Sequence, residues 1–196
     1  MNFVEELKSR FPVLECLTAP EDLEHYGRDW TRFHVPSPVA VVFPRSSDEL
    51  SSILKFCNEK NQAVVPSGGR TGLGGGAVAA RKELVVSMSR MARIEEVDTA
   101  ASSLRVQAGA LTKDAQDKAR AAGLYWPIDL ASAGSSHIGG NIATNAGGLH
   151  VIRYGHVRRW VQSLEVVLMN GEKLELNGDL DKNNTGYDLR NLFIGS

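Results

Sequence analysis

Continuous apolar runs characterise the first half of the chain. The run VAVVFP (39–44) is typical of a strand buried on both faces, and QAVVP (62–66) indicates a second strand of the same kind. Residues 46–61, between them, have the spacing of an amphipathic helix, with Ser47 as the expected N-cap. The apolar face of this helix is formed by Leu50, Ile53, Leu54 and Cys57. Together, these elements predict a βαβ unit with a right-handed crossover.

Alternating patterns characterise the second half. After a third predicted strand at ELVVSM (83–88), apolar and polar residues alternate in RIEEVD, SLRVQAG, SLEVVLMNG and EKLEL. Such segments are typical of antiparallel strands, and a turn is expected at Asn170–Gly171. A helix is predicted over 111–123, with Gly123 at its C′ position.

These patterns predict an α+β fold with two subdomains. Residues 1–35 are expected to form an N-terminal helical arm, beginning with an amphipathic helix at MNFVEELKSRF. A small parallel βαβ subdomain at about 36–95 is then followed by a larger, mainly antiparallel α+β subdomain at about 96–196. A chain of 196 residues with 42% hydrophobic residues is long and apolar enough to bury a core.

The charge of the chain argues against nucleic-acid and membrane partners, and its cysteines favour a reducing compartment. A formal net charge of −1, with basic and acidic residues mixed along the chain, gives no electrostatic footprint for nucleic acid or an anionic membrane. Cys16 and Cys57 lie in different segments without a metal-binding spacing, which favours two reduced core thiols. The N-terminal helix has no secretory or transit character, and no apolar run reaches membrane-spanning length. We therefore expect a cytoplasmic protein.

The segment PSGGRTGLGGGAVA (66–79) has six glycines within the ten positions Ser67–Gly76. It indicates either a flexible tip or a loop whose N–H groups surround a phosphate. GLGGGA matches the G-x-G-x-x-A pattern of nicotinamide cofactor sites, but Gly72 lies six residues past Pro66 and no crossing helix follows. No acidic residue ends the next strand, and no Gly-Lys-Ser/Thr follows, so the context favours neither a dinucleotide fingerprint nor a P-loop.

A second glycine-rich segment is SAGSSHIGGNIATNAGG (132–148), which adds small hydroxyl and amide side chains. Its glycines could serve the close packing of a short helix beginning near Ile138. We favour a ligand-binding role, because interior glycines cost a helix about 1 kcal/mol each. Two such segments in one chain suit a long ligand with a diphosphate in its middle.

The two segments, in this order, resemble the FAD-binding domain of the vanillyl-alcohol oxidase superfamily, which has the PCMH-type fold. The stretches PSGGRTGLGGG, PIDLASAGSSHIGGNIATNAGGLHVIRYG and NNTGYDLRNLFIGS are similar to its D-2-hydroxyacid dehydrogenase branch, which includes D-2-hydroxyglutarate, D-lactate and glycolate dehydrogenases. The resemblance runs from about Trp30 to the last residue. It implies a PCMH-type FAD-binding domain over 36–196 and oxidation of a D-2-hydroxy acid to a 2-oxo acid by hydride transfer to flavin.

The resemblance implies that FAD binds in an extended conformation between the two subdomains, and it also implies which residues contact it. On the diphosphate it places Ser67, Gly68, Gly69, Arg70, Thr71 and Gly72. From the second block it implies Pro127, Asp129, Gly134, Ser135, His137, Gly140, Asn141, Thr144, Asn145 and Gly148, with Tyr154 and Gly155 close by. For His137 we favour a helix-start residue that orients the loop over a direct chemical role. Some relatives attach FAD covalently through a histidine in the first loop, where this chain has Arg70, so the resemblance points to non-covalent FAD.

Groups for the chemistry on the substrate are not evident in the sequence. Hydride transfer to flavin needs a cation for the substrate carboxylate and a base for its hydroxyl, and no cluster offers both, so no catalytic residue is assigned. In the resembled family these groups, and a metal site, come from a C-terminal domain. His150 and His156 lie six residues apart, which suits no shared metal, so none is assigned. His25 and His34 are given no role.

The apolar end NLFIGS predicts a chain interrupted within a structural element. We therefore expect a truncated flavin domain that is inactive alone. The full-length enzyme is expected to act on a small 2-hydroxy acid and to pass electrons to an acceptor that the sequence does not identify. A stand-alone FAD-binding module and a nicotinamide-dependent enzyme are the alternatives.

Overall fold

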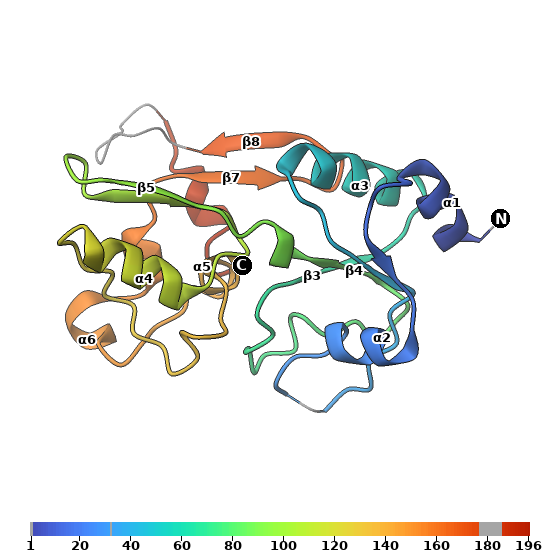
Figure 1. Ribbon diagram of the computed structural model, residues 1–196, viewed down its shortest axis with the longest axis horizontal. Coiled ribbons are helices and arrows are strands. Elements are labelled where there is room, and N and C mark those ends of the chain that lie inside the picture. The colour runs from blue at the N-terminus through green and yellow to red at the C-terminus, as the bar shows by residue number, and fades with distance from the viewer. Residues whose placement is uncertain (1, 32, 177–185) are drawn as a thin grey trace. The chain divides into compact units, whose positions relative to one another are not determined.

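The computed structural model describes residues 2–31, 33–176 and 186–196 (Figure 1). Their contacts divide the chain into two compact units. The first unit comprises Met1–Met91 and Val167–Glu172, and the second comprises Ala92–Val166 and Lys173–Ser196. The Asn-Asn-Thr part of the third similar stretch lies outside the described residues.

A four-stranded sheet forms the centre of the first unit, in the order β1-β2-β4-β3. The strands are β1 (Cys16–Leu17), β2 (Ala40–Val42), β3 (Val64–Ser67) and β4 (Leu84–Ser87). Both β2 and β3 run parallel to β4, whereas β1 pairs antiparallel with β2. The three strands predicted in this part of the sequence are therefore confirmed, and β1 adds an antiparallel edge.

The position of β4 corrects the predicted burial of the second strand. Because β4 lies between β2 and β3, the βαβ unit joins two parallel strands that are not neighbours. All residues of β2 and β4 are buried, but Val64 and Val65 are half-buried and Pro66 is exposed. The strand at 62–66 was thus wrongly expected to be buried on both faces. An edge position suits Pro66, which has no N–H to donate to a further strand.

Helices cover both faces of this sheet (Figure 1). On one face, Val42 and Val86 pack with residues of α1 (Phe3–Arg10) and α3 (Ser47–Glu59). On the other face, Val41 and Val85 pack near α2 (Pro20–Tyr26). This alternation follows from the two-residue period of a strand.

The helix α3 has the predicted apolar face, with Leu50, Ile53, Leu54 and Cys57 all buried. Its N-cap is Ser46 and not Ser47 as predicted. The Ser46 Oγ accepts a hydrogen bond from the Glu49 N–H at 3.2 Å, while Ser47 already has helical geometry. The cap lies one residue earlier because Ser46 is the residue in extended conformation.

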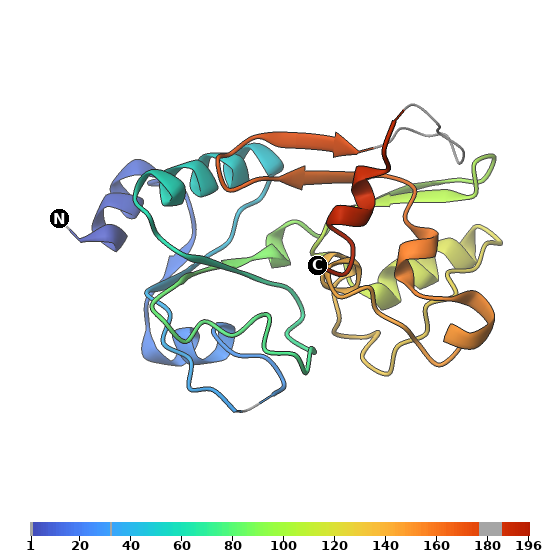
Figure 2. The same cartoon turned by 180° about the vertical axis from the view of Figure 1, so that it is seen from behind.

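The second unit contains two strand pairs and short helices. The strand β5 (Ile94–Asp98) pairs antiparallel with β6 (Ser103–Val106), and β7 (Leu164–Val167) pairs with β8 (Lys173–Leu176). Figures 1 and 2 show β7 and β8 running in opposite directions. The α-helices are α4 (Thr112–Ala121), α5 (Ile138–Ala143) and α6 (Val151–Tyr154), and the 3-10 helices of the two units are Met88–Arg90, Val157–Trp160 and Leu189–Leu192. These strands and the parallel sheet confirm the predicted α+β class.

Two predicted glycine turns are also confirmed. Gly123 has a φ of +76° and follows the C-cap residue of α4. Gly171 has a φ of +86°, and the preceding Asn170 accepts a hydrogen bond from the Glu172 N–H at 3.0 Å. Both φ values lie in the left-handed region that glycine adopts without strain.

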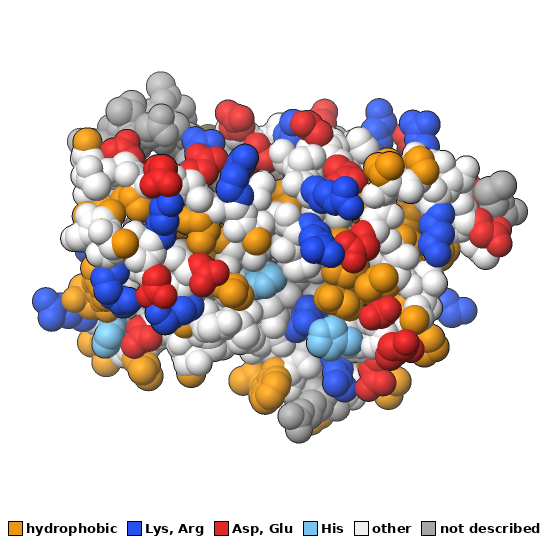
Figure 3. Space-filling view, viewed as in Figure 1, with side chains coloured by type: hydrophobic (Ala, Val, Ile, Leu, Met, Phe, Trp, Pro, Cys, Tyr) orange, Lys and Arg blue, Asp and Glu red, His pale blue; other side chains and the backbone are white. Residues whose placement is uncertain are grey.

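The surface charges are mixed, and both cysteines are free thiols. On the face shown in Figure 3, Lys and Arg side chains lie among Asp and Glu. Cys57 is buried in the core of the first unit, and Cys16, half-buried in an edge strand, packs against the same core. No helix in the described ranges is long and apolar enough to cross a membrane.

Candidate functional site

The first glycine-rich segment leaves the carboxyl end of β3, as the sequence predicted. Ser67 is the last residue of that strand, and an irregular loop follows it. Among the described residues, none accepts a hydrogen bond from the backbone N–H groups of Gly68 through Gly72. Successive free N–H groups in a glycine-rich turn are suited to an anion such as a phosphate.

The Ser67 side chain lies at the start of this row of N–H groups. It is 0% exposed, and its Oγ has no hydrogen-bond partner among the described residues. A buried hydroxyl without a partner is unfavourable, so such an atom calls for a ligand or water. A phosphate oxygen would accept its hydrogen, and the loop therefore fits the diphosphate of FAD.

Arg70, in the middle of the loop, is held by α2. Its backbone has a φ of +56°, its Nη2 lies 3.0 Å from the His25 Nε2, and its guanidinium lies 4.7 Å from the centre of the Tyr26 ring. Burial lowers the pKa of Arg70, although an arginine remains charged at neutral pH. His25, which the sequence left without a role, therefore positions Arg70.

Asp29 is a site residue that sequence reasoning missed. Its carboxylate is 7% exposed and accepts a hydrogen bond from the Gly75 N–H at 2.9 Å. The signal in the sequence was the Asp-Trp-Thr stretch at 29–31, because Asp commonly bonds backbone two residues onward in turns.

In the second unit, the block at 127–148 is organised around the backbone of Asp129. A Cβ added to Gly148 would lie 2.1 Å from the Asp129 carbonyl oxygen, and the same oxygen accepts a hydrogen bond from the Leu149 N–H at 2.9 Å. Pro127, at the start of the block, is buried. The structure thus brings Asp129 and Gly148 together.

Asn141 has an internal partner. It is 5% exposed, and its Nδ2 donates to the Thr112 Oγ1 at 2.6 Å. The Thr112 Oγ1 also lies 2.8 Å from the Ser136 Oγ. These three buried polar side chains connect α4 to α5.

The glycines of α5 have different surroundings. A Cβ on Gly139 would lie 2.7 Å from the Ala108 Cβ, whereas no atom of the described residues lies within 4 Å of one on Gly140. Gly139 is therefore required for close packing of the helix, which was the alternative to a ligand-binding role in the sequence analysis. Gly140 instead borders open surface. His137 occupies the N-cap position of α5, which is the helix-start place expected for it.

The remaining predicted residues of the block lie nearer the surface. Gly134, Ser135 and Thr144 are exposed, and the Thr144 Oγ1 donates to the Gly140 carbonyl at 2.9 Å. Asn145 has a φ of +47° and accepts a hydrogen bond from the Arg158 N–H at 3.0 Å.

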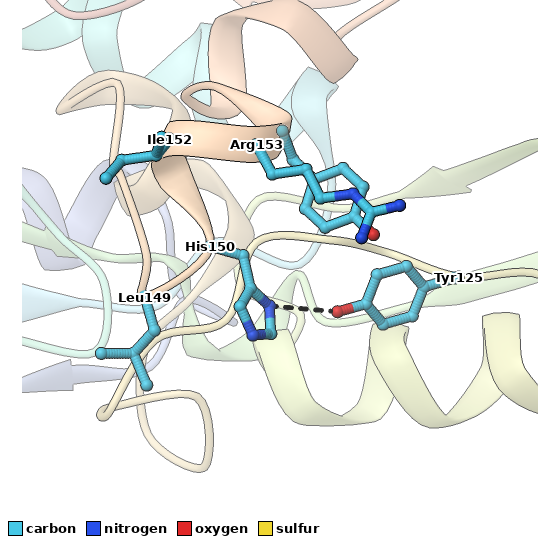
Figure 4. Close-up of a pocket in the computed structure, with 6 residues that line it drawn as sticks. Tyr125, Leu149, His150, Ile152 and Arg153 are labelled. Atoms are coloured by element: carbon cyan, nitrogen blue, oxygen red, sulfur yellow. Dashed lines mark hydrogen bonds between the residues drawn. The ribbon is translucent and has the colours of Figure 1, made fainter.

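Tyr154 lies in an aromatic pocket. The ring centres of Tyr125 and His150 lie 6.0 and 6.1 Å from that of Tyr154. The Tyr125 hydroxyl lies 3.3 Å from the His150 Nδ1 (Figure 4). Gly155 follows α6 with a φ of +77°. In the described part of the chain, no group of three or more His, Cys, Asp or Glu residues could hold a metal ion.

The fold and the row of free N–H groups suit a domain that binds a phosphate-containing cofactor, and comparison with known families identifies that cofactor as FAD. The sequence profile of the FAD binding domain family matches residues 38–177. The chain belongs to this family. The match confirms the resemblance given above and FAD as the cofactor.

The chain is similar in sequence to several D-2-hydroxyglutarate dehydrogenases. The chain is 52% identical over 190 residues to a D-2-hydroxyglutarate dehydrogenase of Xanthomonas citri pv. viticola, covering 97% of this chain and 40% of that protein. It is 50% identical over 193 residues to one of Stutzerimonas stutzeri, covering 98% of this chain and 42% of that protein. The mitochondrial D-2-hydroxyglutarate dehydrogenase of Bos taurus is 43% identical over 92% of this chain and 33% of its own length. The chain therefore spans 33–42% of the length of these relatives.

Solved structures support the fold. An alkyldihydroxyacetonephosphate synthase superposes with a TM-score of 0.84 at 21% identity, over 98% of this chain and 40% of that chain. The 6-hydroxy-D-nicotine oxidase of Arthrobacter nicotinovorans gives a TM-score of 0.72 at 18% identity, over 83% of this chain and 35% of that chain. At these identities the likeness concerns the fold alone.

Proposed function

We propose that this chain is the FAD-binding domain of a dehydrogenase that oxidises a D-2-hydroxy acid to a 2-oxo acid. The names of the relatives support D-2-hydroxyglutarate as the first substrate to test. Bound FAD supplies the acceptor for the hydride from the substrate α-carbon. We propose that the cation that binds the substrate and the base belong to a longer enzyme, which passes its electrons to an unassigned acceptor. This chain alone is expected to have no turnover.

The observation that carries the proposal is the row of free N–H groups from Gly68 to Gly72 beside the buried Ser67 hydroxyl. These neutral donors hold the diphosphate, which explains anion binding in a chain whose net charge is −1. Within the second unit, Gly140 borders open surface and the side chains of Ser135 and Thr144 are exposed, so these predicted contacts are accessible to a ligand.

The mode of attachment and the compartment follow from individual residues. Arg70 stands where a histidine would be needed for a covalent bond to the flavin, so the FAD is non-covalent. Free thiols at Cys16 and Cys57 support a reducing compartment, for which we propose the cytoplasm.

The proposal is tested by adding FAD to the purified chain. We expect a shifted flavin absorption spectrum and a higher melting temperature, with weak affinity. NAD added in parallel should change neither. Absence of any response at saturating FAD would overturn the proposal that this chain retains a cofactor site, and a response to NAD alone would favour the nicotinamide alternative.

A pair of loop variants tests the diphosphate assignment. Gly69→Val should abolish FAD binding because a branched side chain blocks the approach of the backbone to an anion. Gly76→Val is the matched control, since a Cβ there meets no described atom within 4 Å and the residue lies outside the predicted contacts. Equal affinities of the two variants would remove the diphosphate role of Gly69. If the wild-type chain bound FAD as tightly as a full-length relative does, the result would favour the alternative of a stand-alone FAD-binding module.

A further inference from the structure

Asp29 is a buried carboxylate whose two oxygens face different parts of the first unit. Its Oδ1 accepts hydrogen bonds from the Thr31 N–H at 2.8 Å and the Thr31 Oγ1 at 2.7 Å. Its Oδ2 accepts a hydrogen bond from the Gly75 N–H at 2.9 Å. A carboxylate that is only 7% exposed is unfavourable unless donors surround it, and these three donors meet that need.

The backbone next to Asp29 holds the same loop at two further points. The Trp30 N–H donates to the Gly72 carbonyl at 3.1 Å, and the Gly27 carbonyl accepts a hydrogen bond from the Ala79 N–H at 2.8 Å. Segment 27–30 therefore lies along residues 72–79. Because peptide groups are planar, these bonds fix the orientation of the peptide groups at Gly72 and Gly75.

The backbone hydrogen bonds between the loop and segment 27–30 are confined to the second half of the loop. Residues 72–79 are bonded to segment 27–30, whereas the N–H groups of Gly68 through Gly72 have no acceptor among the described residues. Gly75 has a φ of +77°, so Asp29 holds the loop at a residue whose backbone lies in the left-handed region. The backbone of the loop is thus bonded to segment 27–30 in its second half, while the backbone N–H groups of its first half remain available to an anion.

We propose that Asp29 is a positioning residue that sets the course of the glycine loop before FAD binds. The inference rests on the proposed function of this loop. A loop held in its binding conformation loses less entropy on binding, so the Asp29–Gly75 bond contributes to affinity without touching the ligand.

Asp29→Asn separates this role from a general loss of stability. The amide retains one oxygen for the two Thr31 donors, but its NH₂ then faces the Gly75 N–H, and two donors cannot bond each other. We expect that removing the acceptor of the half-buried Gly75 N–H weakens FAD binding about tenfold. Thr31→Val is the matched control, because it removes one hydrogen bond from Oδ1 and leaves Gly75 bonded; we expect its FAD affinity within about twofold of wild type. Equal affinities of the Asp29→Asn variant and wild type would overturn the inference.

Amide hydrogen exchange in the wild-type chain gives a test that needs neither FAD nor a folded Asp29 variant. We expect the Gly75 N–H to exchange more slowly than those of its exposed neighbours Gly74 and Gly76. Equally fast exchange at the three glycines would overturn the inference, even where FAD binds. Failure of wild type to respond to FAD, with Gly75 protected, would instead overturn the proposed function. The two failures are therefore distinguishable.

Discussion

Gly148 lies so close to the backbone of Asp129 that a Cβ at position 148 would come within 2.1 Å of the Asp129 carbonyl oxygen. The hydrogen bond from the Leu149 N–H to the same carbonyl keeps the two segments together at 2.9 Å. Both residues were expected to contact FAD. Their contact shows that glycine at 148 is required by the fold itself, whatever it does for a ligand.

Gly148→Ala is therefore expected to lower the free energy of unfolding by about 3 kcal/mol, the upper range for forcing atoms into a packed site. The matched control is Gly140→Ala in α5, where an added Cβ meets no atom within 4 Å in the part of the chain that the structure describes. Alanine favours a helix over glycine by up to about 1 kcal/mol, so this variant should be as stable as wild type or more stable. Urea denaturation followed by circular dichroism measures both, and equal stabilities would contradict the assigned packing.

Asn141→Ala should destabilise the chain by about 1–3 kcal/mol, because its buried amide bonds the Thr112 Oγ1. Thr112→Val should have a similar cost, since it leaves the Asn141 amide without that acceptor. A double-mutant cycle in urea is expected to give a coupling of about 1 kcal/mol between the two sites. Additive effects would show that the hydrogen bond contributes nothing to stability.

The pKa of His25 is expected to lie below its ordinary value of 6.5, because burial and the charges of Arg70 and Arg28 disfavour its protonated form. Arg70→Ala should raise this pKa, Arg28→Ala should raise it less, and Asp22→Asn should lower it further. Titration of the ring C–H signals by NMR measures each value. A pKa unchanged by Arg70→Ala would contradict the contact between the two side chains.

The sign of the linked stability change follows from the same shift. The unfolded chain protonates His25 near pH 6.5, while the folded chain resists protonation. This contribution to stability is therefore complete above pH 6.5 and is lost as the pH falls below it.

Cys57 should be unreactive toward iodoacetamide at pH 8, since burial raises the pKa of its thiol to about 11 and the thiolate is the nucleophile. The raised pKa stabilises the folded chain fully below the ordinary value of 9.0, and this contribution is lost as the pH rises from there through about 11. The loss of stability of wild type over this range should exceed that of Cys57→Ala, which lacks the group. Identical pH profiles of the two proteins, or rapid alkylation of native Cys57, would contradict its burial.

The secondary structure was largely predictable because its signals are local. The amphipathic spacing of α3 and the apolar runs of β2 and β4 depend on residues a few positions apart, and all three elements are present. Burial of β3 was not predictable from its apolar letters, because an edge strand and a central strand can have the same composition. The insertion of β4 between β2 and β3 decided it.

The candidate site was predictable only in part. The glycine loop after a strand was visible in the sequence, as were the family motifs. The hydrogen bond from Gly75 to Asp29 joins residues 46 positions apart, and the contact of Arg70 with His25 joins residues 45 apart. Neither has a local pattern that identifies its partner.

By itself, the sequence determined the helices α1, α3 and α4, the strands β2 to β8, the two glycine turns and membership of a family that binds FAD, because periodicity and motifs are read along the chain. The tertiary structure decided the strand order, the attachment of the glycine loop to Asp29, and which glycines serve packing and which leave open surface. Those properties depend on which distant segments meet and which polar groups remain without a partner, and only the packed chain brings such groups together.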